Sequence, residues 1–105
     1  MTRLRLAAIG LLLTLASACA TTETAHQNFV NIMNYKVGTD ADSLSNTIWR
    51  DPAARISLRT LPNGNIEEGY RQRQSCRYYF EIDSRTRKIV GWRYEGAFDE
   101  CVVWP

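Results

Sequence analysis

The stretch Cys76-Arg77-Tyr78-Tyr79-Phe80-Glu81-Ile82-Asp83, followed after a short polar loop by Lys88-Ile89-Val90-Gly91-Trp92-Arg93-Tyr94-Glu95, decides the fold of this chain. Apolar and polar residues alternate along both segments, as in half-buried antiparallel strands. With residues 83–87 as the loop, the pattern predicts pairing of Ile82 with Lys88, Phe80 with Val90 and Tyr78 with Trp92. One face then gathers the apolar side chains, and the other carries Arg77, Tyr79, Glu81, Gly91, Arg93 and Glu95.

A second hairpin precedes this pair. Residues 56–61, Ile-Ser-Leu-Arg-Thr-Leu, alternate in the same way, and the turn signal Pro62-Asn63-Gly64-Asn65 follows them. Residues 66–74 then return as the partner strand. The expected sheet is therefore a three- to four-stranded antiparallel meander.

The segment before the strands has helical periodicity. Thr24 and Gln27 form a capping-box pattern ahead of Phe29, Val30, Met33 and Val37, and Gly38 is a stop signal. This predicts a helix from about residue 25 to 36. A weaker second helix is expected over residues 41–47, with Leu44 and Ile48 directed inward. The predicted fold class is α+β, with two N-terminal helices packed on the sheet.

The N-terminus has the features of an export signal. Arg3 and Arg5 precede the apolar run of residues 6–15, which is too short to span a bilayer, and the small residues Ala16-Ser17-Ala18 lead to Cys19. The segment Ala16-Ser17-Ala18-Cys19 resembles the lipobox of bacterial lipoproteins. This resemblance implies a signal peptide over residues 1–18 and acylation of Cys19, with palmitate among the acyl chains. The alternative is an A-x-A cleavage site, because Ala16 stands where Leu is usual. Residues 19–24 would then be a short tether and 25–105 a single small domain.

The cysteine count supports one disulfide. The chain has three cysteines, and lipidation of Cys19 leaves Cys76 and Cys101 as a pair in an oxidising compartment. A reactive thiol or a metal ligand is the alternative, disfavoured because there is no C-x-x-C spacing and His26 is the single histidine. We therefore expect a Cys76–Cys101 disulfide and no metal site.

Charge and motifs argue against several function classes. Two of the 13 basic residues lie in the leader, so the remaining chain has 11 basic and 11 acidic side chains, which favours neither nucleic acid nor a polybasic membrane surface. No G-x-S-x-G, H-E-x-x-H or phosphate-binding glycine loop is present. Glu67 and Glu68 are interpreted as the solvated face of a strand, and His26 as solvent-facing. We expect neither an enzyme nor a cofactor.

The order of these parts resembles a known family. A lipidated cysteine, a short tether, the junction Val37-Gly38-Thr39-Asp40 and a meander containing Phe80-Glu81-Ile82-Asp83 are similar to the SmpA/OmlA lipoproteins of the outer-membrane β-barrel assembly machine. Two features depart from that family: Asp51-Pro52 has no preceding glycine, and the disulfide is not typical of it. The resemblance implies an outer-membrane, lipid-anchored, periplasm-facing protein that contacts an envelope protein. Anchoring in the inner membrane, or release as a soluble periplasmic protein, is the alternative.

The candidate docking residues are those predicted to face outward from the sheet or the tail, namely Arg77, Tyr79, Arg93 and Trp104. Ordinary surface is the alternative for the arginines, and a core position is the alternative for Trp104. Two other functions stay open. The disulfide is also compatible with a periplasmic binding or inhibitor lipoprotein of the lysozyme-inhibitor type, and the anchor with a small lipoprotein of a secretion or conjugation apparatus.

Overall fold

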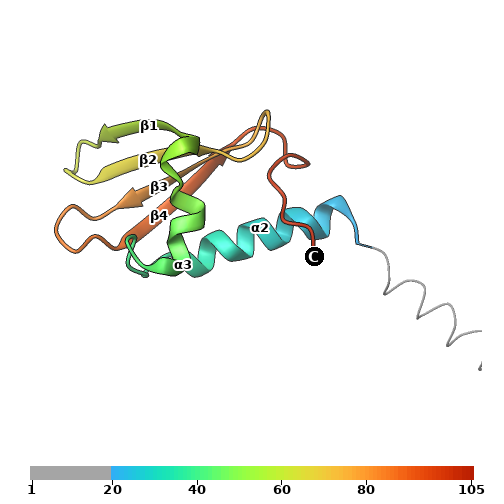
Figure 1. The fold of residues 1–105 in the computed structure, drawn as a ribbon, viewed down its shortest axis with the longest axis horizontal. Helices are drawn as coiled ribbons and strands as arrows, with labels where there is room; N and C mark the ends of the chain where they lie inside the picture. Colours follow the sequence, from blue (N-terminus) through green and yellow to red (C-terminus); the bar gives the residue numbers. More distant parts are fainter. Residues whose placement is uncertain (1–19) are drawn as a thin grey trace, which may run out of the picture.

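The computed structural model describes residues 20–105, so the predicted leader (1–18) and Cys19 lie outside the described residues. Within the described part the chain is α+β, as predicted: helices precede a four-stranded antiparallel sheet (Figure 1). The helices are α2 (Thr22–Lys36), α3 (Leu44–Thr47) and the 3-10 turns η1 (Ile48–Arg50) and η2 (Pro52–Ala54). The strands are β1 (Arg55–Thr60), β2 (Ile66–Arg71), β3 (Arg77–Ile82) and β4 (Ile89–Glu95), in the order β1-β2-β3-β4.

Helix α2 begins three residues earlier than predicted. Thr21 is its N-cap, and the Thr21 hydroxyl accepts a hydrogen bond from the Thr24 backbone N–H at 3.2 Å, so Thr24 lies inside the helix rather than capping it. The helix ends as expected before Gly38, whose φ of 90° lies in the left-handed region. Phe29 and Met33 are fully buried, whereas Val37 is 42% exposed. One apolar stripe therefore holds α2 against the sheet.

The second helix differs from its prediction. It is one turn long, and Leu44 and Ile48 point outward with 88% and 83% of their surface exposed. The residue that turns inward is Asn46, which donates to the Asp40 carbonyl at 2.7 Å and accepts from Lys36 Nζ at 2.8 Å. These bonds satisfy a buried amide and set the rotation of the turn, so the inward placement of the two apolar residues was wrong.

The β3–β4 register is also different from the predicted one. Phe80 pairs with Trp92 and Tyr78 with Tyr94, and a bulge between Glu81 and Ile82 brings Ile82 opposite Ile89. Ile89 is therefore fully buried while Val90 is 45% exposed, the reverse of their predicted placement. The cause is the loop, which closes with the Arg87 N–H on the Asp83 carbonyl at 2.9 Å and Arg87 at a φ of 62°.

The sheet has one covered face and one open face. The covered face packs on α2, where the Phe29 ring meets Trp92 at 5.7 Å, Trp49 at 6.3 Å and Tyr78 at 6.3 Å between centroids. Aromatic pairs at these separations stabilise the core beyond the area they bury. Figure 1 shows the green segment made of α3 and the 3-10 turns after it crossing the sheet, and α2 running along its β4 side. The partition of aromatic residues to this face is the part of the sheet pattern that the sequence predicted.

The C-terminal tail closes one end of the domain. Cys76 and Cys101 form the predicted disulfide, with 5.2 Å between their Cα atoms. The Val103 N–H donates to the Ala25 carbonyl at 2.9 Å, and His26 Nδ1 hydrogen-bonds the Cys101 carbonyl at 2.8 Å. His26 is therefore partly buried against the tail, contrary to its predicted solvent-facing position. A cross-link over 25 residues contributes about 3.5 kcal/mol on the chain-entropy model.

Candidate functional site

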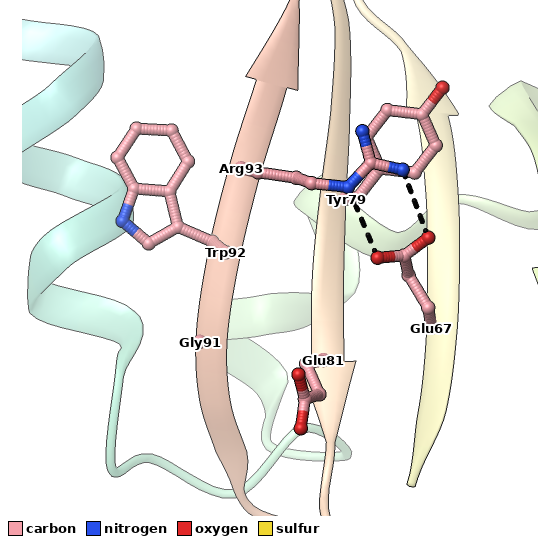
Figure 2. A pocket seen from close by; sticks show the side chains of 6 residues that line it. All are labelled: Glu67, Tyr79, Glu81, Gly91, Trp92 and Arg93. Carbon is pink, nitrogen blue, oxygen red and sulfur yellow. Dashed lines mark hydrogen bonds and ion pairs between the residues drawn. The ribbon is translucent and has the colours of Figure 1, made fainter. Parts of the chain in front are cut away.

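The open face of the sheet is the candidate functional site. It lies opposite the covered face, no described helix packs on it, and it carries a charged network defined by Arg59, Glu67, Tyr79, Glu81, Arg93 and Glu95. These residues share one side because strand residues two apart point to the same face, and the register aligns them across four strands. Figure 2 shows this face with α2 beside β4.

A glycine and a tyrosine form the floor of this network. Gly69 pairs with Tyr79 across β2 and β3, and a Cβ atom on Gly69 would come within 2.6 Å of the Tyr79 ring. The ring therefore lies against bare backbone, which only glycine permits here. The Arg93 guanidinium stacks on the ring at 3.8 Å from its centroid, and Tyr79 is only 8% exposed as a result.

Glu67 is the centre of the network. It accepts hydrogen bonds from Arg93 Nη2 at 3.1 Å, Arg93 Nε at 3.2 Å and Arg59 Nε at 3.0 Å. Arg93 also donates to Glu95 at 2.6 Å. The bonds from Arg93, and after them those from Arg59, hold the pKa of Glu67 below its usual range although burial acts to raise it. The side chain of Glu67 is 8% exposed, so the carboxylate is ionised and almost enclosed by its arginines.

Beside this network lies a shallow hollow of about 170 Å³. Glu81 is on its border, where its carboxylate accepts from the amides of Asn63 at 3.1 Å and Asn65 at 2.8 Å. In Figure 2 the Arg93 guanidinium extends over Tyr79 toward Glu67, while Trp92 points away toward α2, where its indole N–H donates to Asn34 at 2.8 Å. The hollow is therefore polar and is bordered by groups that already have hydrogen-bond partners.

The chemistry of this face suits recognition of charged groups. The pKa of Glu95 is lowered in the same way as that of Glu67, chiefly by hydrogen bonds from Arg93. A general acid at neutral pH requires a raised carboxyl pKa, which is the opposite direction. Within residues 20–105, no three His, Cys, Asp or Glu side chains are grouped as metal ligands would be. The network can instead exchange ion pairs and hydrogen bonds with a partner surface.

The predicted docking residues have different surroundings. Tyr79 and Arg93 are brought together, but Tyr79 is buried beneath Arg93 rather than available for contact. Arg77 is exposed at the end of the same face, directly across from Arg71 and Glu95. Trp104 is 48% exposed and follows Val103, whose carbonyl accepts from Asn28 on α2. Trp104 therefore lies with the tail beside α2, apart from the open face, and is not a core residue.

Sequence reasoning missed Glu67 and Glu68. Both were interpreted as solvated, yet they are 6% and 4% exposed and lie on opposite faces. Glu68 is on the covered face, where Arg50 donates to both of its carboxylate oxygens at 2.9 and 3.0 Å and the Tyr70 hydroxyl donates to one. Gly69 was the available signal, because a glycine inside a strand marks the close approach of another group.

Comparisons with protein-family models, characterised proteins and solved structures find no match for this chain. In the described part of the chain, no helix has the length and hydrophobicity to cross a bilayer.

Proposed function

We propose that this chain is a lipid-anchored protein of the bacterial envelope with a structural or assembly role, and that its open face binds an envelope protein partner. The observation that carries the proposal is the open face itself. Four strands present an ordered network of ionised side chains there, and no described element covers it. Polar, charge-patterned surfaces of this kind give specificity to protein contacts that form between exposed domains.

The N-terminal sequence supports the location of this contact. Acylation at Cys19 would add two or three chains, which is enough for stable membrane residence. Helix α2 begins at Thr22, so two residues would separate the anchor from the folded domain, a reach of about 7 Å when extended. The domain would then be held close to the bilayer, where a large envelope complex can present a surface to it.

The pairing of the charges supports binding rather than catalysis. Glu67 is already ionised and bonded, so it needs no partner to be stable, while the exposed parts of Arg59 and Arg93 retain free donor positions. Side chains fixed in this way lose little conformational entropy when a partner binds. The open face is therefore pre-organised for charged and polar contacts.

Affinity purification of the mature protein from mildly solubilised membranes tests this proposal. We expect recovery of one or more envelope proteins by the wild type and a loss of at least about tenfold in yield for Glu81→Lys, which reverses a rim charge on the open face. Asp99→Lys is the matched control, because it makes the same charge change in the exposed tail. The proposal is wrong if no envelope protein is recovered by the wild type, or if both variants recover it equally.

A further inference from the structure

A second surface lies at the start of the edge strand β1, and the open-face network does not include it. Two adjoining hollows of about 330 and 270 Å³ share Ala54, Arg71 and Gln72. Together they form a groove between η1–η2 and the end of β2, which we call the edge groove. Arg55 and Ile56 line one part of it, and Ile48, Trp49, Asp51 and Tyr78 line the other.

The edge groove combines exposed apolar side chains with arginines that lack an anionic partner. Ile48 is 83% exposed and Ile56 39% exposed. Arg55 and Arg71 are exposed, and within residues 20–105 neither forms an ion pair, although most other arginines of the sheet and helices do. Asp51 is the acidic group of the groove, and its carboxylate accepts instead from the Ala53 N–H at 2.9 Å.

The register adds to this excess of positive charge. Arg71 is directly opposite Arg77 across β2 and β3, where like charges repel one another; Arg77 has Glu95 on its other side across β4, whereas Arg71 has no acidic residue opposite it in the register. A bound carboxylate would relieve this repulsion and pair with guanidinium groups that are otherwise solvated. The charge of the groove therefore favours an acidic occupant.

The edge strand indicates the form of that occupant. β1 pairs with β2 on one side, and the sheet order leaves its other side at the edge, where Leu58 is 56% exposed. An extended segment can add to such an edge through main-chain hydrogen bonds. A second copy of this chain paired through β1 would supply no carboxylate, because residues 55–62 contain neither Asp nor Glu. A copy paired β1 to β1 would therefore leave the arginines of the groove without an anionic partner, and the charge of the groove favours an acidic segment of another protein.

We propose that the edge groove binds an extended segment of a partner protein in which acidic residues alternate with bulky apolar ones. The segment adds to β1, places an apolar side chain beside Ile48 and Trp49, and places a carboxylate on Arg55 and Arg71. This goes beyond the proposed function, because the edge groove is a surface separate from the open face, and it rests on that function only for the existence of a protein partner.

A peptide titration tests the proposal. The probe is an eight-residue blocked peptide of alternating Val and Glu, and the comparison peptides alternate Val with Gln or with Lys. Added to the mature lipidated protein in uncharged nanodiscs, the Glu peptide is expected to shift the NMR signals of Trp49 and of the β1 amides, and to bind at least about tenfold more tightly than the other two.

Matched variants separate a specific site from general charge. Arg55→Gln with Arg71→Gln should weaken binding of the Glu peptide about tenfold or more. Arg85→Gln with Lys88→Gln makes the same charge change in the exposed β3–β4 loop and should leave binding unchanged. Circular dichroism and melting curves of both double variants establish that they fold.

Several outcomes would overturn the proposal. These are equal affinity for the Glu and Lys peptides, equal loss in both double variants, absence of binding at millimolar peptide, or stronger arginine-dependent binding to phosphatidylglycerol vesicles than to the peptide. A concentration-dependent dimer formed through β1 would also contradict it. Peptide binding without recovery of any envelope protein would keep the edge groove and reject the proposed function. Recovery of an envelope protein without peptide binding would keep the proposed function and reject the edge groove.

Discussion

Glu67 and Glu68 are adjacent in the sequence and both nearly buried, but they lie on opposite faces of the sheet and have different partners. Glu68 is on the covered face, bonded to Arg50, whose side chain is 14% exposed, and to Tyr70. Glu67 is on the open face, bonded to Arg59 and Arg93, whose side chains are 61% and 44% exposed. The same residue type therefore joins η1 to the sheet on one face and organises a solvent-facing network on the other.

The difference lies in what remains when the carboxylate is removed. On the covered face, Arg50 would keep its charge in a partly buried place, with the Ala41 carbonyl and Asp42 as its other partners. On the open face, Arg59 and Arg93 would turn to water at little cost. The covered face thus carries the stability, and the arginine side chains of the open face stay exposed to solvent.

The largest effect is expected for Glu68→Ala. Removing Glu68 leaves Arg50 with the exposed Asp42 as its remaining anionic partner, and the Tyr70 hydroxyl loses its acceptor, so we expect a loss of about 3 kcal/mol in the free energy of unfolding. Urea denaturation measures it. The double variant Glu68→Leu with Arg50→Met should be more stable than Glu68→Ala alone, because it removes both charges. A loss below about 1 kcal/mol for Glu68→Ala would contradict the assignment of this pair to the stability of the domain.

The next effect concerns the floor of the open face. Gly69→Ala places a Cβ atom against the Tyr79 ring and the Ser57 hydroxyl, so the ring and the Arg93 above it must move. We expect a loss of about 1 to 3 kcal/mol and a change in the NMR signals of Tyr79. Gly91→Ala is the matched control, since its Cβ would meet no atom within 4 Å. Equal losses in the two variants would mean that strand propensity, and not the close approach of the ring, sets the cost.

Features of the fold that depend on local sequence patterns could be predicted, and features that depend on pairing between polar groups from different segments could not. The hairpins, the aromatic face and the disulfide depend on local alternation and on cysteine count, and these predictions are confirmed. The rotation of α3 depends on Asn46, whose partners Lys36 and Asp40 are distant enough in sequence that no pattern shows them. Polar groups that are buried by pairing have the same sequence pattern as polar groups that face water.

The candidate site could be predicted only in part, because its buried polar groups have the same sequence pattern as solvated ones. Alternation correctly places Tyr79 and Arg93 on one outward side, but it does not reveal that Arg93 covers Tyr79. The buried state of Glu67 depends on Arg59, which comes from another strand, and on the bare backbone at Gly69. The edge groove required the structure as well, because residues 48–56 and 71–72 meet there only after the sheet forms.

Acid should weaken the domain through both glutamates. Although burial acts to raise the pKa of Glu68, hydrogen bonds from Arg50 and Tyr70 hold it below its usual value, and Arg93 lowers the pKa of Glu67. Groups with a depressed folded pKa contribute stability that is present above the unfolded pKa, near 4.5, and is lost as pH falls through the folded pKa. Denaturation curves between about pH 5 and 2 should therefore show falling stability, with a shallower fall in Glu68→Gln and in Glu67→Gln. An unchanged slope in both variants would assign acid unfolding to other carboxylates.

The smallest effect is expected for Glu67→Gln. Its two arginines are largely solvated, the amide can still accept one hydrogen bond, and the stacking of Arg93 on Tyr79 does not require the carboxylate, so we expect a loss of at most about 1 kcal/mol. Glu68→Gln, measured beside it by urea denaturation, should lose clearly more because its partner is less exposed. If the two losses are equal, the open-face network is a structural element like the covered one, and the contrast on which its proposed binding role rests is lost. If Glu67→Gln instead leaves stability intact but lowers partner recovery, the ionised carboxylate acts in binding, since neither the fold nor the position of Arg93 over Tyr79 would have changed.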